Sequence, residues 1–460
     1  MYETEFSYEV EFTKKAADTI TLKPDGTVTG EYHGTWKKDG SKLTLDLGSG
    51  HVYKGVFLKQ ANELMSRDMT MTFTAEGENV DTAIYVLSRI AGEGADRTAD
   101  KGDYYLKDEE HQMLADICAY YRDVIVVINA GAQVDLSFMD EFKNIKALLT
   151  IVQPGMEGGH ALADIITGEV TPCGKLTDTW AKDYFAFPCA GTFSHMNGNV
   201  EKEYYQEGIY VGYRYFDSFE KEVEFPFGFG LSYTEFQIVD VKVEIQKEIR
   251  VTATIKNTGS LYSGKEVLQV YATCPQSGME KEYKRLCGFA KTDLLAPGES
   301  QQLIVTFDEK ALASFCEKDS AWVMEAGKYG IWAGNSSQNI TLAAVLEVKE
   351  TTIIEKTEHI CPVQEELTEL ECSKELRIKK EQQWHELAAK SNIPTITFTP
   401  VMMEKETLPQ PKTWEKAREI TEKLTDEELI AMVIGEISKG QGQALGSAGN
   451  MVPGAAGETS

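Results

Sequence analysis

The sequence lacks the residue spacings that hold metals or cross-link small domains. Its eight cysteines are scattered from Cys118 to Cys372 without a Cys-x-x-Cys pair, and its seven histidines show no ligand spacing. Neither a zinc site nor a disulfide framework is therefore predicted, and no metal or other cofactor is expected.

Long apolar runs are also absent. No stretch approaches the roughly 20 apolar residues that a membrane-spanning helix needs. The first twelve residues, MYETEFSYEVEF, have neither the basic region nor the apolar region of a signal peptide. We therefore expect a cytoplasmic protein without a membrane partner.

Basic residues are scarce relative to acidic ones. The 460 residues include 46 Lys and Arg against 73 Asp and Glu, which gives a formal net charge of -27. Such a charge repels phosphate backbones and anionic lipid headgroups, so nucleic acid is not an expected partner. The length predicts about three domains. The composition makes no prediction of the oligomeric state.

Residues 1–79 alternate apolar and polar positions between strong turn signals. Pro24-Asp25-Gly26 and Asp39-Gly40 are turn formers, and period-two runs at 19–22, 52–58 and 69–74 predict strands. Several short hairpins in succession favour a small β-barrel or sandwich. The strings GTW, YKGVFLKQ and MTFTAEG in this block resemble the lipocalin-like β-domain of family 43 arabinan-degrading enzymes.

Residues 80–235 alternate strand and helix signals, which predicts a mostly parallel sheet covered by helices. Directly after the apolar run 83–87 comes SRIAGEGADR, in which Glu93 stands between two glycines and is followed by Asp96 and Arg97. Flanking glycines let a backbone turn sharply and approach a ligand, so an acid placed there suits general acid chemistry. The same string is also typical of a charged surface turn.

Five motifs in order resemble glycoside hydrolase family 3. They are GEGADR with GDYYL, NAGAQVDL from Asn129, the Gly-rich segment 153–176, YYQEGIYVGYRYFD at 204–217, and FPFGFGLSYTEF at 225–236. The resemblance implies that residues 80–235 form that family's α/β sandwich domain, with Glu93 as its acid/base glutamate. Asp96 and Arg97 are then expected to bind substrate or shape the loop. The family usually has further βα units before this glutamate, where this chain has the β-block.

In residues 236–350, alternating apolar and polar positions predict strands at 239–245, 249–255 and 266–273. This pattern favours a seven-stranded antiparallel sandwich. This block resembles the fibronectin type III-like module that follows the family's sandwich domain. Residues 351–412 are charged and interrupted by prolines, which predicts a linker with a helical patch at 365–389. In residues 413–460, Thr425 and Glu428 form a capping-box signature before an apolar run, and the segment resembles the start of the family's (β/α)8 barrel.

The resemblance as a whole implies a retaining β-glycosidase of the β-glucosidase type, with the barrel placed last and only its opening present. Its substrates would be oligosaccharides with terminal β-linked sugars, or aryl glycosides. The nucleophile would lie on barrel loops missing from this chain, so no residue here receives that role and the isolated chain should have little or no activity. An alternative is a non-catalytic carbohydrate-binding or scaffold fragment. A third is bond cleavage by phosphate, although a glutamate at position 93 favours hydrolysis.

Other conspicuous residues have structural interpretations. Arg89, just before the Glu93 loop, is expected to be structural. The aromatic and basic residues Tyr210, Tyr213, Arg214 and Tyr215 either contact substrate or pack beneath the sheet, and packing is favoured. The glycines at 155, 158 and 159 match no nucleotide-binding pattern and predict a turn into a helix, where His160 is an early residue.

Overall fold

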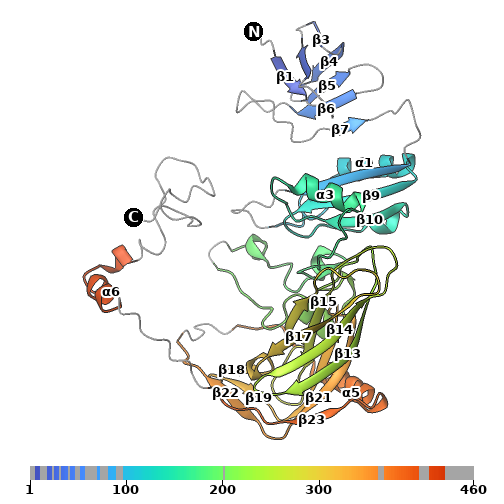
Figure 1. Cartoon of the computed structure of the whole chain (residues 1–460). Helices are drawn as coiled ribbons and strands as arrows, with labels where there is room; N and C mark the ends of the chain where they lie inside the picture. Colours follow the sequence, from blue (N-terminus) through green and yellow to red (C-terminus); the bar gives the residue numbers. More distant parts are fainter. Residues whose placement is uncertain are drawn as a thin grey trace. The chain divides into compact units, whose positions relative to one another are not determined.

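The computed structural model shows a chain with two compact units (Figure 1). It describes residues 6–10, 18–22, 25–30, 33–39, 42–46, 52–56, 70–72, 81–89, 97–199, 202–360, 367–403 and 414–429. The first unit comprises residues 1–87, 107–127 and 139–149, and the second comprises 88–106, 128–138 and 150–460. Within the described residues, no helix is both long and apolar enough to cross a membrane.

The first unit begins with a seven-stranded antiparallel meander. Its strands, in sheet order, are β1 (Phe6–Val10), β2 (Asp18–Leu22), β3 (Thr27–Gly30), β4 (Gly34–Asp39), β5 (Lys42–Asp46), β6 (Val52–Val56) and β7 (Thr70–Thr72). Gly26 makes the β2–β3 turn with φ +84°, and Asp25 accepts a hydrogen bond from the Thr27 amide at 3.0 Å. The expected strands are confirmed. The expected barrel is not, because β1 and β7 are unpaired ends of the sheet in the described part of the chain.

A three-stranded sheet follows, in the order β10–β9–β8. Its strands are β8 (Thr82–Arg89), β9 (Asp123–Ala130) and β10 (Ile145–Thr150). The Asp123 amide donates to the Asp81 carbonyl at 3.0 Å, and the Val124 amide donates to the Asn144 carbonyl at 2.9 Å. These bonds join the starts of the strands, so the strands run in parallel and their carboxyl ends share one edge of the sheet.

Helices and short elements connect these strands to the next domain. They are α1 (Asp108–Tyr120), α2 (Phe138–Glu141), α3 (Gly158–Thr167), β11 (Trp180–Ala181), η1 (Tyr184–Ala186), η2 (Ser194–Asn197), α4 (Tyr213–Ser218) and β12 (Val223–Phe225). Lys107 caps α1, and its amide donates to the Glu110 carboxylate at 2.8 Å. Asp108 is thus the first helical residue, where a carboxylate favours the positive end of the helix dipole.

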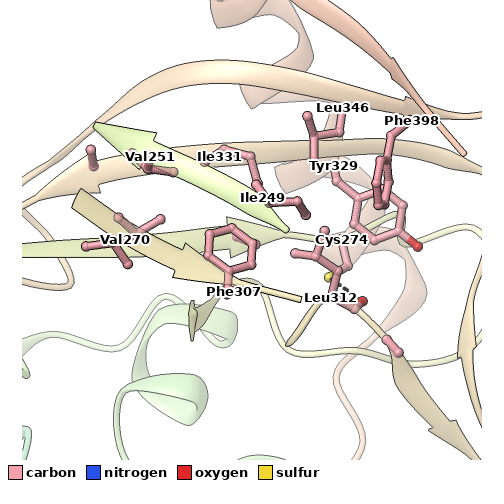
Figure 2. Packing of buried hydrophobic residues seen from close by; sticks show 14 of the residues in the cluster. Ile249, Val251, Val270, Cys274, Phe307, Leu312, Tyr329, Ile331, Leu346 and Phe398 are labelled. Carbon is pink, nitrogen blue, oxygen red and sulfur yellow. Dashed lines mark hydrogen bonds between the residues drawn. The ribbon is translucent and has the colours of Figure 1, made fainter. Parts of the chain in front are cut away.

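The second unit contains a β-sandwich. One sheet consists of β13 (Phe236–Ile245), β14 (Ile249–Asn257) and β17 (Ser300–Phe307). The other contains, in order, β16 (Arg285–Lys291), β15 (Val267–Thr273), β20 (Gly327–Gly334), β21 (Ile340–Val348) and β23 (Thr395–Phe398). Figure 2 shows side chains of both sheets pointing toward one another, with Val251 and Phe307 from the first and Val270, Ile331 and Leu346 from the second. This core arises because alternate residues of β14 are buried.

A small third sheet joins β18 (Ser314–Cys316), β19 (Ala321–Met324) and β22 (Thr352–Lys356), and η3 (Glu309–Ala311) precedes it. This sheet and strand β23 contradict two of the sequence predictions. Residues 351–412 include ordered parts of the domain and are not simply a linker. The sandwich is also not wholly antiparallel, because β23 pairs in parallel with β21, placing Ile396 opposite Leu346.

Helix α5 (Lys374–Lys390) also belongs to this domain. It begins after Ser373, whose hydroxyl accepts the Leu376 amide at 3.3 Å, and so starts later than the predicted patch at 365–389. Trp384 of α5 is 2% exposed and packs in a cluster with Trp332 and Val345. A helix anchored by a buried tryptophan cannot act as a free linker.

The last described residues contain α6 (Trp414–Thr421) and the predicted capping box. The Thr425 amide donates to the Glu428 carboxylate at 2.9 Å, and the Glu428 amide donates to the Thr425 hydroxyl at 3.3 Å. The box is therefore confirmed. The rest of the expected barrel segment, from residue 430 to 460, lies outside the described residues.

Candidate functional site

The predicted acid/base residue lies between two anchored arginines. Glu93 and Asp96 belong to residues 90–96, which lie outside the described residues. Strand β8 ends at Arg89 just before this segment, and the described chain resumes at Arg97. The contacts of these two arginines describe the chain on either side of the segment.

Arg89 is fixed by backbone carbonyls. Its side chain is 7% exposed, and it donates to the carbonyls of Asp103 and Ser88, each at 2.9 Å, and of Tyr105 at 3.5 Å. Saturating a buried guanidinium with carbonyls offsets much of its desolvation cost. The structural interpretation of Arg89 is thus confirmed.

Arg97 is fixed to the same short segment. It forms an ion pair with the Asp103 carboxylate, which also accepts the Thr98 amide at 2.7 Å. The Arg97 guanidinium further donates to the Gln133 carbonyl at 2.9 Å. Asp103 therefore holds both flanks of residues 90–96, through its carbonyl on one side and its carboxylate on the other.

Two tyrosines follow Asp103. The Tyr105 hydroxyl donates to the Asp183 carboxylate at 2.7 Å, and Tyr104 packs edge-on against Tyr184, with ring centroids 5.3 Å apart. Burial, followed by the hydrogen bond to Asp183, raises the pKa of Tyr105 to about 12. Burial also raises the pKa of Tyr104. Both phenols therefore stay neutral near pH 7 and keep their hydrogen-bonding roles.

The loops after β9 and β10 reach the same place. The Gln153 side chain donates to the Arg89 carbonyl at 3.1 Å, and the Gln133 side chain donates to the Thr179 carbonyl at 3.0 Å. Val152 and Gln153 adopt φ of 47° and 53°, which is costly for residues with a side chain and is typical of functional loops. We call Arg89, Arg97, Asp103, Gln133 and Gln153 the strand-end site. Ligands of open α/β sheets bind at this carboxyl edge.

Three oxygen atoms at this edge are buried without a hydrogen-bond partner among the residues that the structure describes. They are the Asn129 Oδ1, Gln133 Oε1 and Thr179 Oγ1 atoms. Buried polar atoms in native proteins are nearly always paired, so exceptions mark places where a further group is bound. These oxygen atoms can therefore accept hydrogen bonds from a bound ligand.

The sequence did not single out several residues that this geometry brings together. Asp103 and Gln133 lie in the motifs GDYYL and NAGAQVDL, but their roles and the contribution of Asp183 became visible only in the structure. By contrast, the aromatic cluster packs as favoured, with Tyr210 0% and Tyr213 9% exposed. The predicted turn into α3 is present, and His160 there contacts Glu157 at 2.6 Å.

Among the described residues, no three His, Cys, Asp or Glu side chains lie together in a way that could hold an ion. The carboxylates of the strand-end region are engaged with protein groups instead, such as Asp135 with the Ser137 hydroxyl at 2.6 Å.

The chain matches two known domain families. Residues 12–233 match the glycosyl hydrolase family 3 C-terminal domain, and residues 266–337 match the fibronectin type III-like domain. The first match begins at residue 12, so it includes the β-meander as well as the α/β sheet. The expected fold class, α/β plus all-β with a fibronectin-like module, is confirmed.

Known proteins resemble the chain over the same region. A β-glucosidase of Ruminococcus albus is 39% identical over 293 residues, which is 62% of this chain and 30% of the relative. Among solved structures, a β-glucosidase from Paenibacillus barengoltzii has a TM-score of 0.58 at 37% identity, covering 61% of this chain and 32% of that one. β-Glucosidase 3B from Thermotoga neapolitana, solved with glucose, has a TM-score of 0.56 at 39% identity, covering 59% and 38%. The chain spans about a third of these proteins' length.

Proposed function

Because residues 12–233 belong to the C-terminal domain of family 3 glycosyl hydrolases, we propose that this chain supplies the general acid/base of a retaining β-glucosidase, with Glu93 as that residue. The observation that carries the proposal is the anchoring of both flanks of residues 90–96 to Asp103. Such anchoring suits a group that must be held in a precise position, as catalysis requires. The relatives named above support a β-glucoside as substrate.

In this reaction one carboxylate attacks the anomeric carbon and a second carboxyl group protonates the leaving oxygen. The second group then takes a proton from the water that releases the sugar. Such an acid works best when its pKa lies near the operating pH.

The nucleophile is not assigned to this chain. The nearby carboxylates described are committed elsewhere, Asp103 to Arg97 and Asp183 to Tyr105. We therefore propose that the nucleophile is supplied by the part of a family 3 enzyme that lies outside the matched region. The chain alone is then expected to hydrolyse glycosides weakly or not at all.

The test compares Glu93→Gln with the parent chain on two aryl β-glucosides, one with a phenol and one with a dinitrophenol leaving group. Where the chain alone is inactive, it is assayed after mixing with the unmatched part of the Ruminococcus albus relative. We expect activity on the phenyl glucoside to fall at least about 10²-fold, and activity on the dinitrophenyl glucoside to fall less, since a good leaving group needs no proton.

The exposed Glu109→Gln on α1 is the matched control and should keep full activity. Circular dichroism checks that each variant is folded. Equal losses in Glu93→Gln and Glu109→Gln, or no loss in either, would remove Glu93 from the catalytic role.

A further inference from the structure

The second unit contains a cavity that is separate from the strand-end site. It has a volume of about 370 Å³ and lies where α4, the segment before β16, the β20–β21 connection and α5 meet. None of its lining residues belongs to the strand-end site. Its size is at the small end of ligand pockets, which suits a single small molecule.

Two buried lysines line this cavity. The side chain of Lys284 is 5% exposed and that of Lys380 is 11% exposed. The Lys284 ammonium lies 3.2 Å from the Asp217 carboxylate, and the Lys380 ammonium donates to the Asp217 carbonyl at 2.5 Å. Both cations therefore depend on one buried acidic residue.

That acidic residue does not fully offset the desolvation of the lysines. Burial lowers the pKa of both Lys284 and Lys380 despite the attraction of Asp217. The half-exposed Glu220 lies 3.8 Å from Lys380, and it also pairs with Lys379, outside the cavity lining, at 3.4 Å. A bound anion would be favourable beside these ammonium groups.

The charges that line the cavity indicate how much negative charge it accepts. Lys221 also lines it, so three lysines face two acids, Asp217 and Glu220. One positive charge is left unbalanced, in a chain whose net charge is -27. A group with one negative charge, such as a carboxylate, would balance it, whereas a phosphate monoester carries about -1.5 to -2 and would exceed it.

The remaining walls suit a ring with polar substituents. Phe216 and Trp332 are buried beneath the lining, whereas the partly exposed Ile340 and Tyr283 supply its apolar surface, with the Lys380 ammonium 4.4 Å from the centroid of the Tyr283 ring. The exposed Gln338 supplies an amide group at the rim, 3.4 Å from the Asp217 carboxylate. Aromatic surface combined with a few polar groups is typical of sites that orient small polar ligands.

We propose that this cavity binds a hexuronate, a sugar ring that bears one carboxylate. Its carboxylate lies beside Lys221 and Lys380, and its ring packs against Tyr283. The site is independent of the glycosidase activity proposed above, because it uses no residue of the strand-end site.

Calorimetric titration of the full chain with D-glucuronate tests this proposal. We expect saturable binding to one site, and at least tenfold weaker binding to Lys380→Met. Lys390→Met is the matched control, because this exposed lysine of α5 pairs with Glu386 and neither residue lines the cavity. Its affinity should stay within twofold of the parent chain. Lys221→Gln, at an exposed position, should also weaken binding and provides a second variant if Lys380→Met does not fold.

Titrations with D-glucose, which has the ring without the carboxylate, and with acetate, which has the carboxylate without the ring, test the two parts of the ligand separately. Glucose binding as tight as glucuronate would overturn the role of the carboxylate, and acetate binding as tight would overturn the role of the ring. Absence of glucuronate binding at millimolar concentration would overturn the site itself. So would unchanged binding in folded Lys380→Met or Lys221→Gln.

Discussion

Two asparagines, one in the sandwich and one at the sheet edge beside the strand-end site, show how these two regions differ. Asn257 in β14 is 0% exposed, donates to the carbonyls of Tyr262 and Leu295 at 2.9 Å each, and accepts from the Thr234 hydroxyl at 2.6 Å. Asn129, at the carboxyl end of β9, has a buried Oδ1 without a partner. The first asparagine is a saturated part of a scaffold, whereas the second keeps an acceptor available. The scaffold asparagine is fully buried and hydrogen-bonded, whereas the one at the sheet edge is half-buried and its Oδ1 has no partner among the described residues.

The largest expected effect is on the stability of the fold, and it tests this difference between the two asparagines. Asn257→Ala removes the partner of the Tyr262 carbonyl and of the Thr234 hydroxyl, and one of the two donors to the Leu295 carbonyl, so we expect the free energy of unfolding to fall by about 3 kcal/mol. Asn129→Ala removes an atom that is already unpaired and should cost about 1 kcal/mol or less. Chemical denaturation of both variants measures this. Equal losses would show that the two asparagines play the same role.

A smaller and local effect is expected at the strand-end site. Asp103→Ala removes the partner of Arg97 and the acceptor of the Thr98 amide, at a cost of about 1–2 kcal/mol. Hydrogen exchange should show lost protection at Thr98, while amides of β14 stay protected. Asp100→Ala, an exposed carboxylate in the same loop, should leave protection at Thr98 unchanged. A uniform loss of protection across the sandwich would contradict a local role for Asp103.

The smallest effect concerns alkaline pH. The pKa of Tyr105 is raised to about 12, from an ordinary value of 10.0, chiefly by burial. Its contribution to stability is therefore complete below pH 10 and declines as the pH rises toward 12, because the unfolded state loses the phenol proton first. Unfolding followed between pH 9 and 12 should show this decline in the parent chain and a weaker one in Tyr105→Phe. Identical curves would exclude Tyr105 as the cause.

The sequence predicted three of the seven strands of the meander and three strands of the sandwich. It did so because alternation and turn residues such as Asp25-Gly26 are local signals. It missed the docking of α5, because that helix is polar around nearly its whole circumference and buries only Lys380 and Trp384. A single buried tryptophan gives no periodic pattern. The parallel strand β23 has only four residues, too few to reveal a partner.

The candidate site was predictable only in part. The Gly-flanked Glu93 was visible as a motif, whereas Asp103 became important only through contacts with Arg89 and Arg97 on either side of that motif. Gln133 and Asp183 come from other loops. Such contacts arise from tertiary structure, and one sequence carries no local signal for them.

The parallel pairing of β23 with β21 has a consequence for synthesis on the ribosome. Strand β21 is complete at Val348, but its partner begins at Thr395. Because these are roughly fifty residues apart, translation leaves this side of β21 unpaired for about 2–10 s. An unpaired strand edge can recruit another nascent chain. Slower translation through residues 349–394 should therefore lengthen the period in which polysomes are prone to aggregate.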